Sequence, residues 1–158
     1  MYNVIRKFTF GGSIMAVWQL TAYAKEGTDE FKRIIEALGK EDIKVFAMSV
    51  AQINDLICIR YIADDVNDRA TECVFDIGLI AKPRKVVCVQ IPEGFKGLVR
   101  ALDMIAQNGV CVDYSYAFFE KFEGEYCYVL RPADIDLAEL ILKKAGYKVY
   151  DTETLGQF

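Results

Sequence analysis

Residues 86–98, with the sequence VVCVQIPEGFKGL, decide the fold of this chain. The unbroken apolar run of residues 86–89 is typical of a buried strand, and it ends at the turn Pro92-Glu93-Gly94. Apolar residues return at a helical period from Leu98, so the stretch predicts a strand, a glycine loop and the start of a helix. The unpaired backbone N–H groups at such a helix start can hold a small anion such as a carboxylate, but the same loop can equally be a plain connection.

The residues before this stretch predict six elements. In residues 17–24, Leu20, Ala22 and Ala24 alternate with Gln19, Thr21 and Tyr23, which predicts a strand. A helix with its apolar face over residues 31–38 follows and stops near Gly39. Two stretches rich in β-branched and aromatic residues, 43–50 and 56–63, predict a hairpin. A second helix ends at Gly78, and residues 79–81 predict a short closing strand.

The second half of the chain repeats this order. Gly27 matches Gly94 and Phe31 matches Leu98 at one constant offset, and Gly78 matches Gly146 at an offset one residue larger. The extra residue falls in the turn of residues 120–125, where insertions are cheap. Such repetition predicts two copies of one small domain, residues 17–84 and 86–152. The linker between them, Lys82-Pro83-Arg84, is too short to let the copies move far apart.

Each copy fits a split βαβ pair, so the fold class is α+β, with two tandem ferredoxin-like βαββαβ units whose sheets are antiparallel. The helix-free face of such a sheet should be polar. Residues 86–89 and 56–59 are instead apolar on both faces, and residues 114–118 offer few polar side chains that could face water. We therefore expect the helix-free face to be covered by another domain or chain, and the protein to be at least a homodimer.

Composition narrows the function further. The chain has 158 residues, of which 53% are hydrophobic and 27% charged, and it can bury a substantial core. A net charge of -4, a pI near 5.0 and the lack of a basic run argue against nucleic acid or an anionic membrane as partner. With no run long enough to span a bilayer and no signal-peptide core at the start, we expect a cytoplasmic protein.

The chemistry-bearing residues do not indicate an enzyme. The five cysteines are widely spaced within apolar runs, as buried residues are in a reducing compartment, and their spacing fits neither a disulfide framework nor a zinc site. The chain has no histidine, which removes the commonest general base and the commonest transition-metal ligand. We therefore expect no catalytic residues, no metal and no cofactor.

Residues 1–16 fit this repeat pattern poorly. The Gly-Gly pair of residues 11–12 lies just ahead of Met15 and looks like a translated ribosome-binding site, which would make Met15 the true start. An N-terminal arm carrying Phe8 and Phe10 is the equal alternative.

Four segments carry motifs that can be compared with known families: residues 112–118, VDYSYAF, and 129–131, VLR, in the second repeat, and residues 47–49 and 55–62 in the first. These motifs resemble those of tandem ACT domain proteins, a family of amino-acid-sensing modules in amino-acid metabolism. Residues 112–118 look like the family's second-repeat strand, residues 129–131 match the strand ending that follows it, and the two segments of the first repeat look like their counterparts. The resemblance covers residues 17 to about 152, and it implies a free-standing regulatory protein that binds an amino acid at the junction of the repeats.

The resemblance places the ligand at the two loops before the first helix of each repeat. The implied binding residues are Gly27, Thr28 and Asp29 in the first loop, Gly94, Phe95, Lys96, Gly97 and Leu98 in the second, and Ser49, Tyr114 and Ser115 on the strands. Family loops usually read Asn-Lys-Pro-Gly-Arg-Leu, and here Asp29 and Lys96 replace the glycine that lets the backbone approach the ligand.

Each of these residues also has a purely structural interpretation. Thr28 or Asp29 fits a helix N-cap, and Arg60 fits an ion pair with a carboxylate such as that of Asp55. Tyr114 fits a core or interface position with its hydroxyl hydrogen-bonded, and the serines fit local backbone hydrogen bonds. Three functions thus compete. The first is a sensor that regulates a partner enzyme or transporter, and the second is an interaction module that has kept the fold and lost the ligand. An enzyme comes third, because histidine, metal-ligand spacing and a nucleophile–base pair are lacking.

Overall fold

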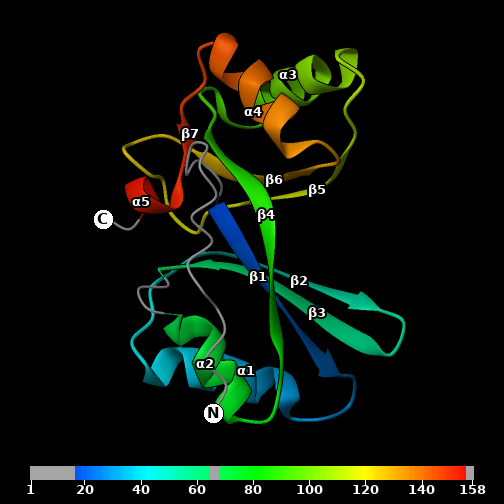
Figure 1. Cartoon of the computed structure of the whole chain (residues 1–158), viewed down its shortest axis with the longest axis vertical. Helices are drawn as coiled ribbons and strands as arrows, with labels where there is room; N and C mark the ends of the chain where they lie inside the picture. Colours follow the sequence, from blue (N-terminus) through cyan, green and yellow to red (C-terminus); the bar gives the residue numbers. More distant parts are fainter. Residues whose placement is uncertain (1–16, 65–67, 156–158) are drawn as a thin grey trace.

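The computed structural model describes residues 17–64 and 68–155, so the expectations for residues 1–16 lie outside the described residues. Its elements follow the order of the two repeats (Figure 1). In chain order they are β1 (Val17–Lys25), α1 (Glu30–Lys40), β2 (Val45–Ile53), β3 (Leu56–Ala63), α2 (Arg69–Asp76), β4 (Ala81–Gln90), α3 (Gly94–Gln107), β5 (Val112–Ala117), β6 (Cys127–Pro132), α4 (Ile135–Lys144), β7 (Val149–Tyr150) and α5 (Thr152–Leu155). None of the described helices is both long and apolar enough to cross a membrane.

The first unit is an antiparallel sheet in the order β2-β3-β1-β4 with α1 and α2 on one face. Helix α1 turns Ile34 and Leu38 toward the sheet, where they join Ile59 and Tyr61 of β3 in a buried core. The second unit repeats this arrangement in the order β7-β4-β6-β5, with Ile105 of α3 in its own core. The predicted α+β class, with ferredoxin-like units in tandem, is confirmed.

Strand β4 belongs to both units. Residues 81–86 pair with β1, and residues 87–90 pair with β6, while Cys88 and Val89 also pair with β7. The expected linker Lys82-Pro83-Arg84 therefore does not exist as a linker, because it lies within a continuous strand (Figure 1). Pro83 cannot donate a ladder hydrogen bond. Among the described strands, only β1 pairs with the first half of β4, and such an edge position tolerates proline.

The closing strand predicted at residues 79–81 was also misplaced. Leu79 and Ile80 have no strand conformation, and β4 starts at Ala81. The boundary that we expected between residues 84 and 86 falls inside β4. The two units are thus joined by backbone hydrogen bonds of a shared strand rather than by a flexible connection.

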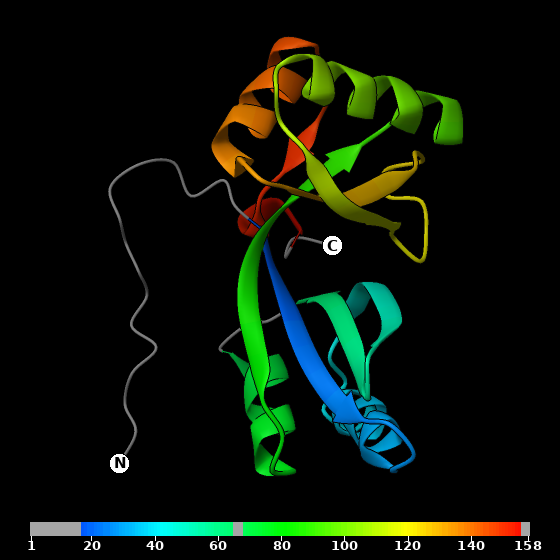
Figure 2. The ribbon, with the colours of Figure 1, turned by 90° about the vertical axis from the view of Figure 1, so that its right-hand side faces the viewer.

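The helix-free faces of the two sheets face each other inside the chain. The six-stranded path curls until β2 approaches β5, where Ala47 bridges to Phe118 and the Phe119 N–H donates to the Phe46 carbonyl at 2.8 Å (Figure 2). Between the sheets lies an apolar core that combines Val17, Phe46, Ile62, Val86, Cys88, Phe118, Val129 and Tyr150. The strands that are apolar on both faces are thus covered by the other unit. This removes the argument from which we expected a homodimer, and the homodimer stays a prediction.

We expect Ile62→Ala to lower the free energy of unfolding by roughly 2–5 kcal/mol, because Ile62 is 1% exposed in the core between the sheets. Urea unfolding followed by circular dichroism and by fluorescence of Trp18 should remain a single shared transition, since the units share β4. The control is Ile80→Ala, whose side chain is 61% exposed and which should change stability little. Two separate transitions in the parent protein would contradict a shared core.

Candidate functional site

The β4–α3 loop has a tightly constrained backbone. Glu93 and Gly94 both have positive φ angles, 66° and 58°, and Glu93 is the N-cap of α3 without a side-chain cap hydrogen bond. A Cβ on Gly97 would lie 2.0 Å from the Pro92 carbonyl oxygen, so only glycine lets the first turn of α3 sit on the loop. Gly97 is thus required by packing, independently of any ligand.

The other predicted residues of this loop divide into exposed and buried ones. Phe95 is 75% exposed and Lys96 is exposed as well, whereas Leu98 belongs to the core of the second unit. Gly94 lies against the ring of Tyr126. Lys96 lies in the first turn of α3, with its side chain exposed.

A cavity of about 400 Å³ opens beside this loop, between α3 and the α4–β7 connection. It is lined by Gln90, Pro92, Glu93, Arg100, Met104, Ala145, Gly146, Tyr147 and Lys148. An exposed ion pair joins Arg100 to Glu93 at its edge, and the hydrogen bond to Glu93 raises the pKa of Arg100 above its usual value. The cavity therefore presents a cation and an anion next to each other at its edge. The sequence did not indicate Arg100, because only the folded loop brings it to Glu93.

The polar groups of the first loop, between β1 and α1, hydrogen-bond to one another. The Thr28 hydroxyl donates to the Lys25 carbonyl at 2.7 Å and accepts from the Glu30 N–H at 3.3 Å, while the Glu30 carboxylate accepts from the Lys25 N–H at 2.6 Å. Asp29 occupies the N-cap position, but its side chain makes no cap hydrogen bond. The expected capping role thus falls to Thr28, and part of the helix start is already occupied.

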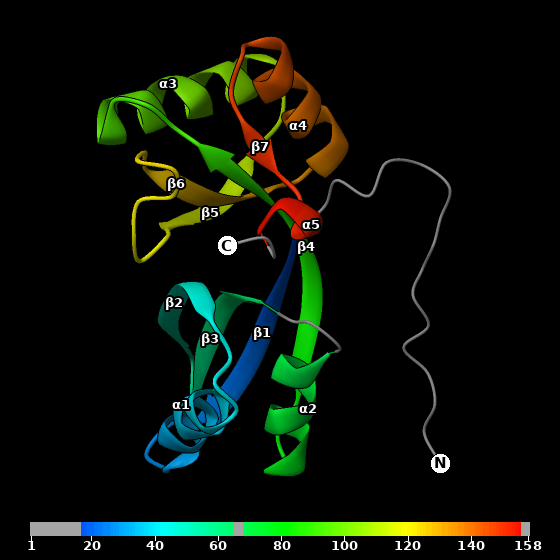
Figure 3. The same cartoon turned by 90° about the vertical axis from the view of Figure 1, so that its left-hand side faces the viewer.

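The two predicted loops do not meet within one chain. The Gly27–Asp29 loop follows β1 at one extremity of the molecule, and the loop between β4 and α3 lies toward the other (Figure 1, Figure 2, Figure 3). One chain therefore offers two separate loops rather than a single junction site.

The predicted strand residues lie in a third place, on and around the helix-free face. Tyr114 and Tyr116 reach Gln19, which is fully buried: the Gln19 amide donates to the Tyr114 hydroxyl at 2.9 Å, and the Tyr116 hydroxyl donates to the Gln19 amide oxygen at 2.8 Å. Ser49 pairs with Arg60 across the β2–β3 ladder, whereas Ser115 is exposed. Burial, with smaller contributions from Cys88 and Tyr114, raises the pKa of Tyr116, which keeps its phenol neutral.

Arg60 does not form the ion pair expected with Asp55. Its guanidinium lies over the ring of Tyr114, 4.2 Å from the ring centroid, and no ion pair of Arg60 is found within residues 17–64 and 68–155. A cation–π contact thus replaces the carboxylate partner.

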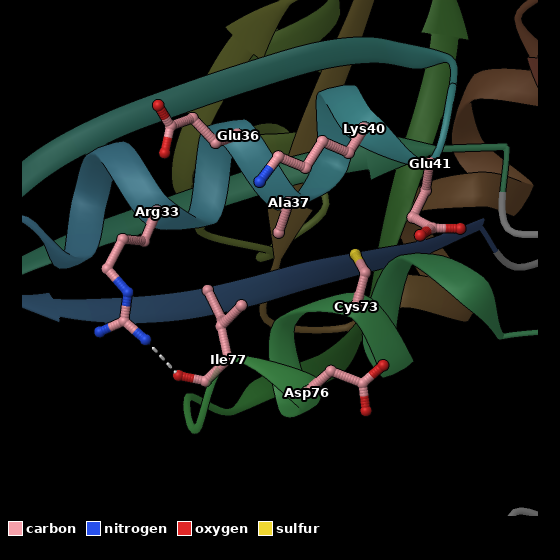
Figure 4. Close-up of a pocket in the computed structure, with 8 residues that line it drawn as sticks. All are labelled: Arg33, Glu36, Ala37, Lys40, Glu41, Cys73, Asp76 and Ile77. Carbon is pink, nitrogen blue, oxygen red and sulfur yellow. Dashed lines mark hydrogen bonds between the residues drawn. The ribbon is translucent and has the colours of Figure 1, made fainter.

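A smaller pocket of about 260 Å³ lies between α1 and α2, on the helical face of the first unit (Figure 4). Five charged residues, Arg33, Glu36, Lys40, Glu41 and Asp76, line it together with Ala37, Cys73 and Ile77. Arg33 of α1 donates to the Ile77 carbonyl at 2.6 Å and so ties the two helices together. No predicted site residue lies there. In the described part of the chain no acidic, cysteine or histidine cluster could hold a metal ion.

We expect Gly97→Ala to destabilise the fold by at least about 1–3 kcal/mol, because the added methyl would collide with backbone that cannot move freely. The matched control is Gly39→Ala, near the end of α1, where nothing lies within 4 Å and where alanine should gain up to ~1 kcal/mol. Thermal denaturation of both variants gives the comparison. Equal stability of the two variants would show that the loop can relax around a side chain.

Comparison with known proteins agrees with this fold. No protein-family model and no curated protein matches the sequence. Among solved structures, protein BT0572 from Bacteroides thetaiotaomicron has a TM-score of 0.81 and 24% identity, over 92% of this chain and 100% of that chain. The regulatory subunit of aspartate kinase from Thermus thermophilus, in its ligand-free form, has a TM-score of 0.57 and 15% identity, over 82% and 89% of the two chains.

The regulatory subunit from Thermus flavus is similar to the same degree, with a TM-score of 0.55 and 14% identity, over 82% of this chain and 90% of that one. Identities this low establish shared architecture rather than shared activity. The chain therefore has the tandem ACT-type fold to which its sequence motifs pointed.

Proposed function

We propose that this protein is a regulatory amino-acid sensor whose ligand binds beside the β4–α3 loop. The observation that carries the proposal is the cavity at this loop, with the ion pair of Glu93 and Arg100 at its edge. A free amino acid carries one carboxylate and one ammonium group a few ångströms apart. Arg100 can take the carboxylate and Glu93 the ammonium group, so the ligand would replace one ion pair by two.

The size and lining of the cavity suit such a ligand. Its volume of about 400 Å³ lies within the range of small-molecule sites, and Met104 and Tyr147 provide apolar surface for a side chain. Lys96 adds positive charge at the adjacent helix start, where a carboxylate is favoured. The structural similarity to regulatory subunits of aspartate kinase supports a regulatory role, in which ligand binding acts on a partner enzyme or transporter and the protein itself catalyses nothing.

The second candidate is an interaction module without a ligand. It is favoured by the first loop, whose helix start is occupied by Thr28 and Glu30, and by Phe95, which is 75% exposed beside the second loop. A thermal-shift screen of the twenty amino acids separates the two. A shift for one or a few amino acids supports the sensor, whereas a flat profile supports the module.

We expect Arg100→Gln to weaken binding of the best amino acid from this screen by roughly tenfold or more, because a charge-assisted hydrogen bond to the carboxylate is lost. Arg69→Gln is the matched control, since Arg69 forms an ion pair of similar exposure with Glu41 in the first unit. Isothermal titration calorimetry measures both. An equal affinity of the two variants would place the ligand elsewhere.

We also expect the second loop, and not the first, to bind. Lys96→Glu reverses a charge at the start of α3 and should weaken binding by up to roughly tenfold, while Asp29→Gly should leave affinity unchanged or improved. The same titration tests both variants. Loss of binding in Asp29→Gly alone would assign the site to the first loop.

A further inference from the structure

Four basic residues converge on the helix-free face where the two sheets part. Across the ladders, Thr21 of β1 lies between Arg60 of β3 and Lys82 of β4, and its neighbour Gln19 lies opposite Arg84. Directly opposed residues of an antiparallel pair point to the same face of a sheet. Arg131 of β6 joins them, since it pairs with Tyr114, which hydrogen-bonds to Gln19. We call Arg60, Lys82, Arg84 and Arg131 the cationic face.

Within the described residues, no carboxylate forms an ion pair with these charges. In β1 to β6, the ladder positions on this face hold no Asp or Glu, and the nearest acid of β5, Asp113, is the extra residue of a bulge. Within residues 17–64 and 68–155, none of the four basic residues forms an ion pair. Basic residues elsewhere do, as Lys32 with Glu36 shows. The cationic face is therefore locally positive, although the net charge of the whole chain is -4.

A buried hydrogen-bond network supports the cationic face. Gln19, buried completely, joins Thr21 at 3.0 Å and both tyrosine hydroxyls, so the floor of the face is a closed hydrogen-bond network. Arg60 is half-buried and stacks on Tyr114, which fixes the direction of its guanidinium. A preorganised guanidinium loses less freedom on binding an anion than a mobile one does.

The spacing suits a small ligand with more than one negative group. Arg60 and Lys82 lie two strand spacings apart, about 10 Å, and their side chains can reach inward to a common point. Arg84 lies two residues further along β4, on the same face. Arg60 and Arg131 are half-buried, while Lys82 and Arg84 are exposed, so the four residues form an inner and an outer pair. An extended polyanion such as nucleic acid would contact only the outer pair and would meet the negative remainder of the chain.

We propose that the cationic face binds a small polyanion, a metabolite that carries two or more phosphate or carboxylate groups. Arg60 and Arg131 would hold the inner oxyanion group, and Lys82 and Arg84 the outer one. This site is separate from the cavity at Glu93 and Arg100, and it does not depend on amino-acid sensing.

The test is calorimetric titration of the full chain with inorganic pyrophosphate and, separately, with citrate, at constant ionic strength. The double variant Lys82→Gln/Arg84→Gln should weaken binding by roughly tenfold, since it removes two exposed charges and no buried contact. The matched control is Lys144→Gln, an exposed lysine at the end of α4, which should change affinity less than twofold. Arg60→Lys keeps the charge but loses the planar stack on Tyr114, and it should weaken binding by an intermediate factor. Raising the salt concentration should weaken binding of the parent more steeply than that of the double variant, which keeps only two of the four charges.

Several results would overturn the proposal. These are the absence of pyrophosphate and citrate binding, an equal loss in the double variant and in Lys144→Gln, saturable binding of polyglutamate alone, or a change of oligomeric mass in the double variant, which would make the face an interface between copies. Arg100→Gln should bind pyrophosphate normally, so failure of the amino-acid site and failure of this site remain distinguishable.

Discussion

The structure depends on the backbone pairing of β4. One ten-residue strand completes the sheet of the first unit with residues 81–86 and begins that of the second with residues 87–90. Neighbouring strands twist by about 20–25° relative to each other, so six strands joined through one shared strand curl instead of forming a flat sheet. The curl brings β2 to β5 and turns two helix-free faces into one interior. The helices remain outside, where each pair covers its own sheet.

The polarity of this interior changes along the strands. Around the contact of Ala47 with Phe118 it is apolar and tightly aromatic, whereas around Gln19 it is a satisfied polar network with a cation above it. A buried amide with all its partners costs little, but it tolerates few alternative arrangements. Strand β4 carries Lys82 at one end and Gln90, which lines the cavity of the second unit, at the other. Both candidate sites are therefore built on the strand that the two units share.

Sequence patterns predicted the helices, the hairpins and the repeat, because each depends on local periodicity. They failed around Pro83, where they predict a linker, although a strand edge that no described strand covers tolerates proline. The alternation of polar and apolar residues placed Gln19 and Leu20 on opposite faces of β1. It could not show that both faces of this strand are buried. The Arg100 cavity was out of reach, because its walls come from segments some fifty residues apart in the chain, at Pro92 and Tyr147.

The shared strand also limits how this chain can change over evolution. Successive side chains of β4 point to opposite faces of the sheet. One inserted residue near Pro83 would therefore turn the buried side chains of β4 in one unit to the opposite face, while those in the other unit kept their direction. Lineages of this protein should therefore tolerate length variation in the hairpin turns but only even-numbered, compensated changes within residues 81–90. What this strand constrains most is whether the number of inserted residues is odd or even, rather than which residues they are.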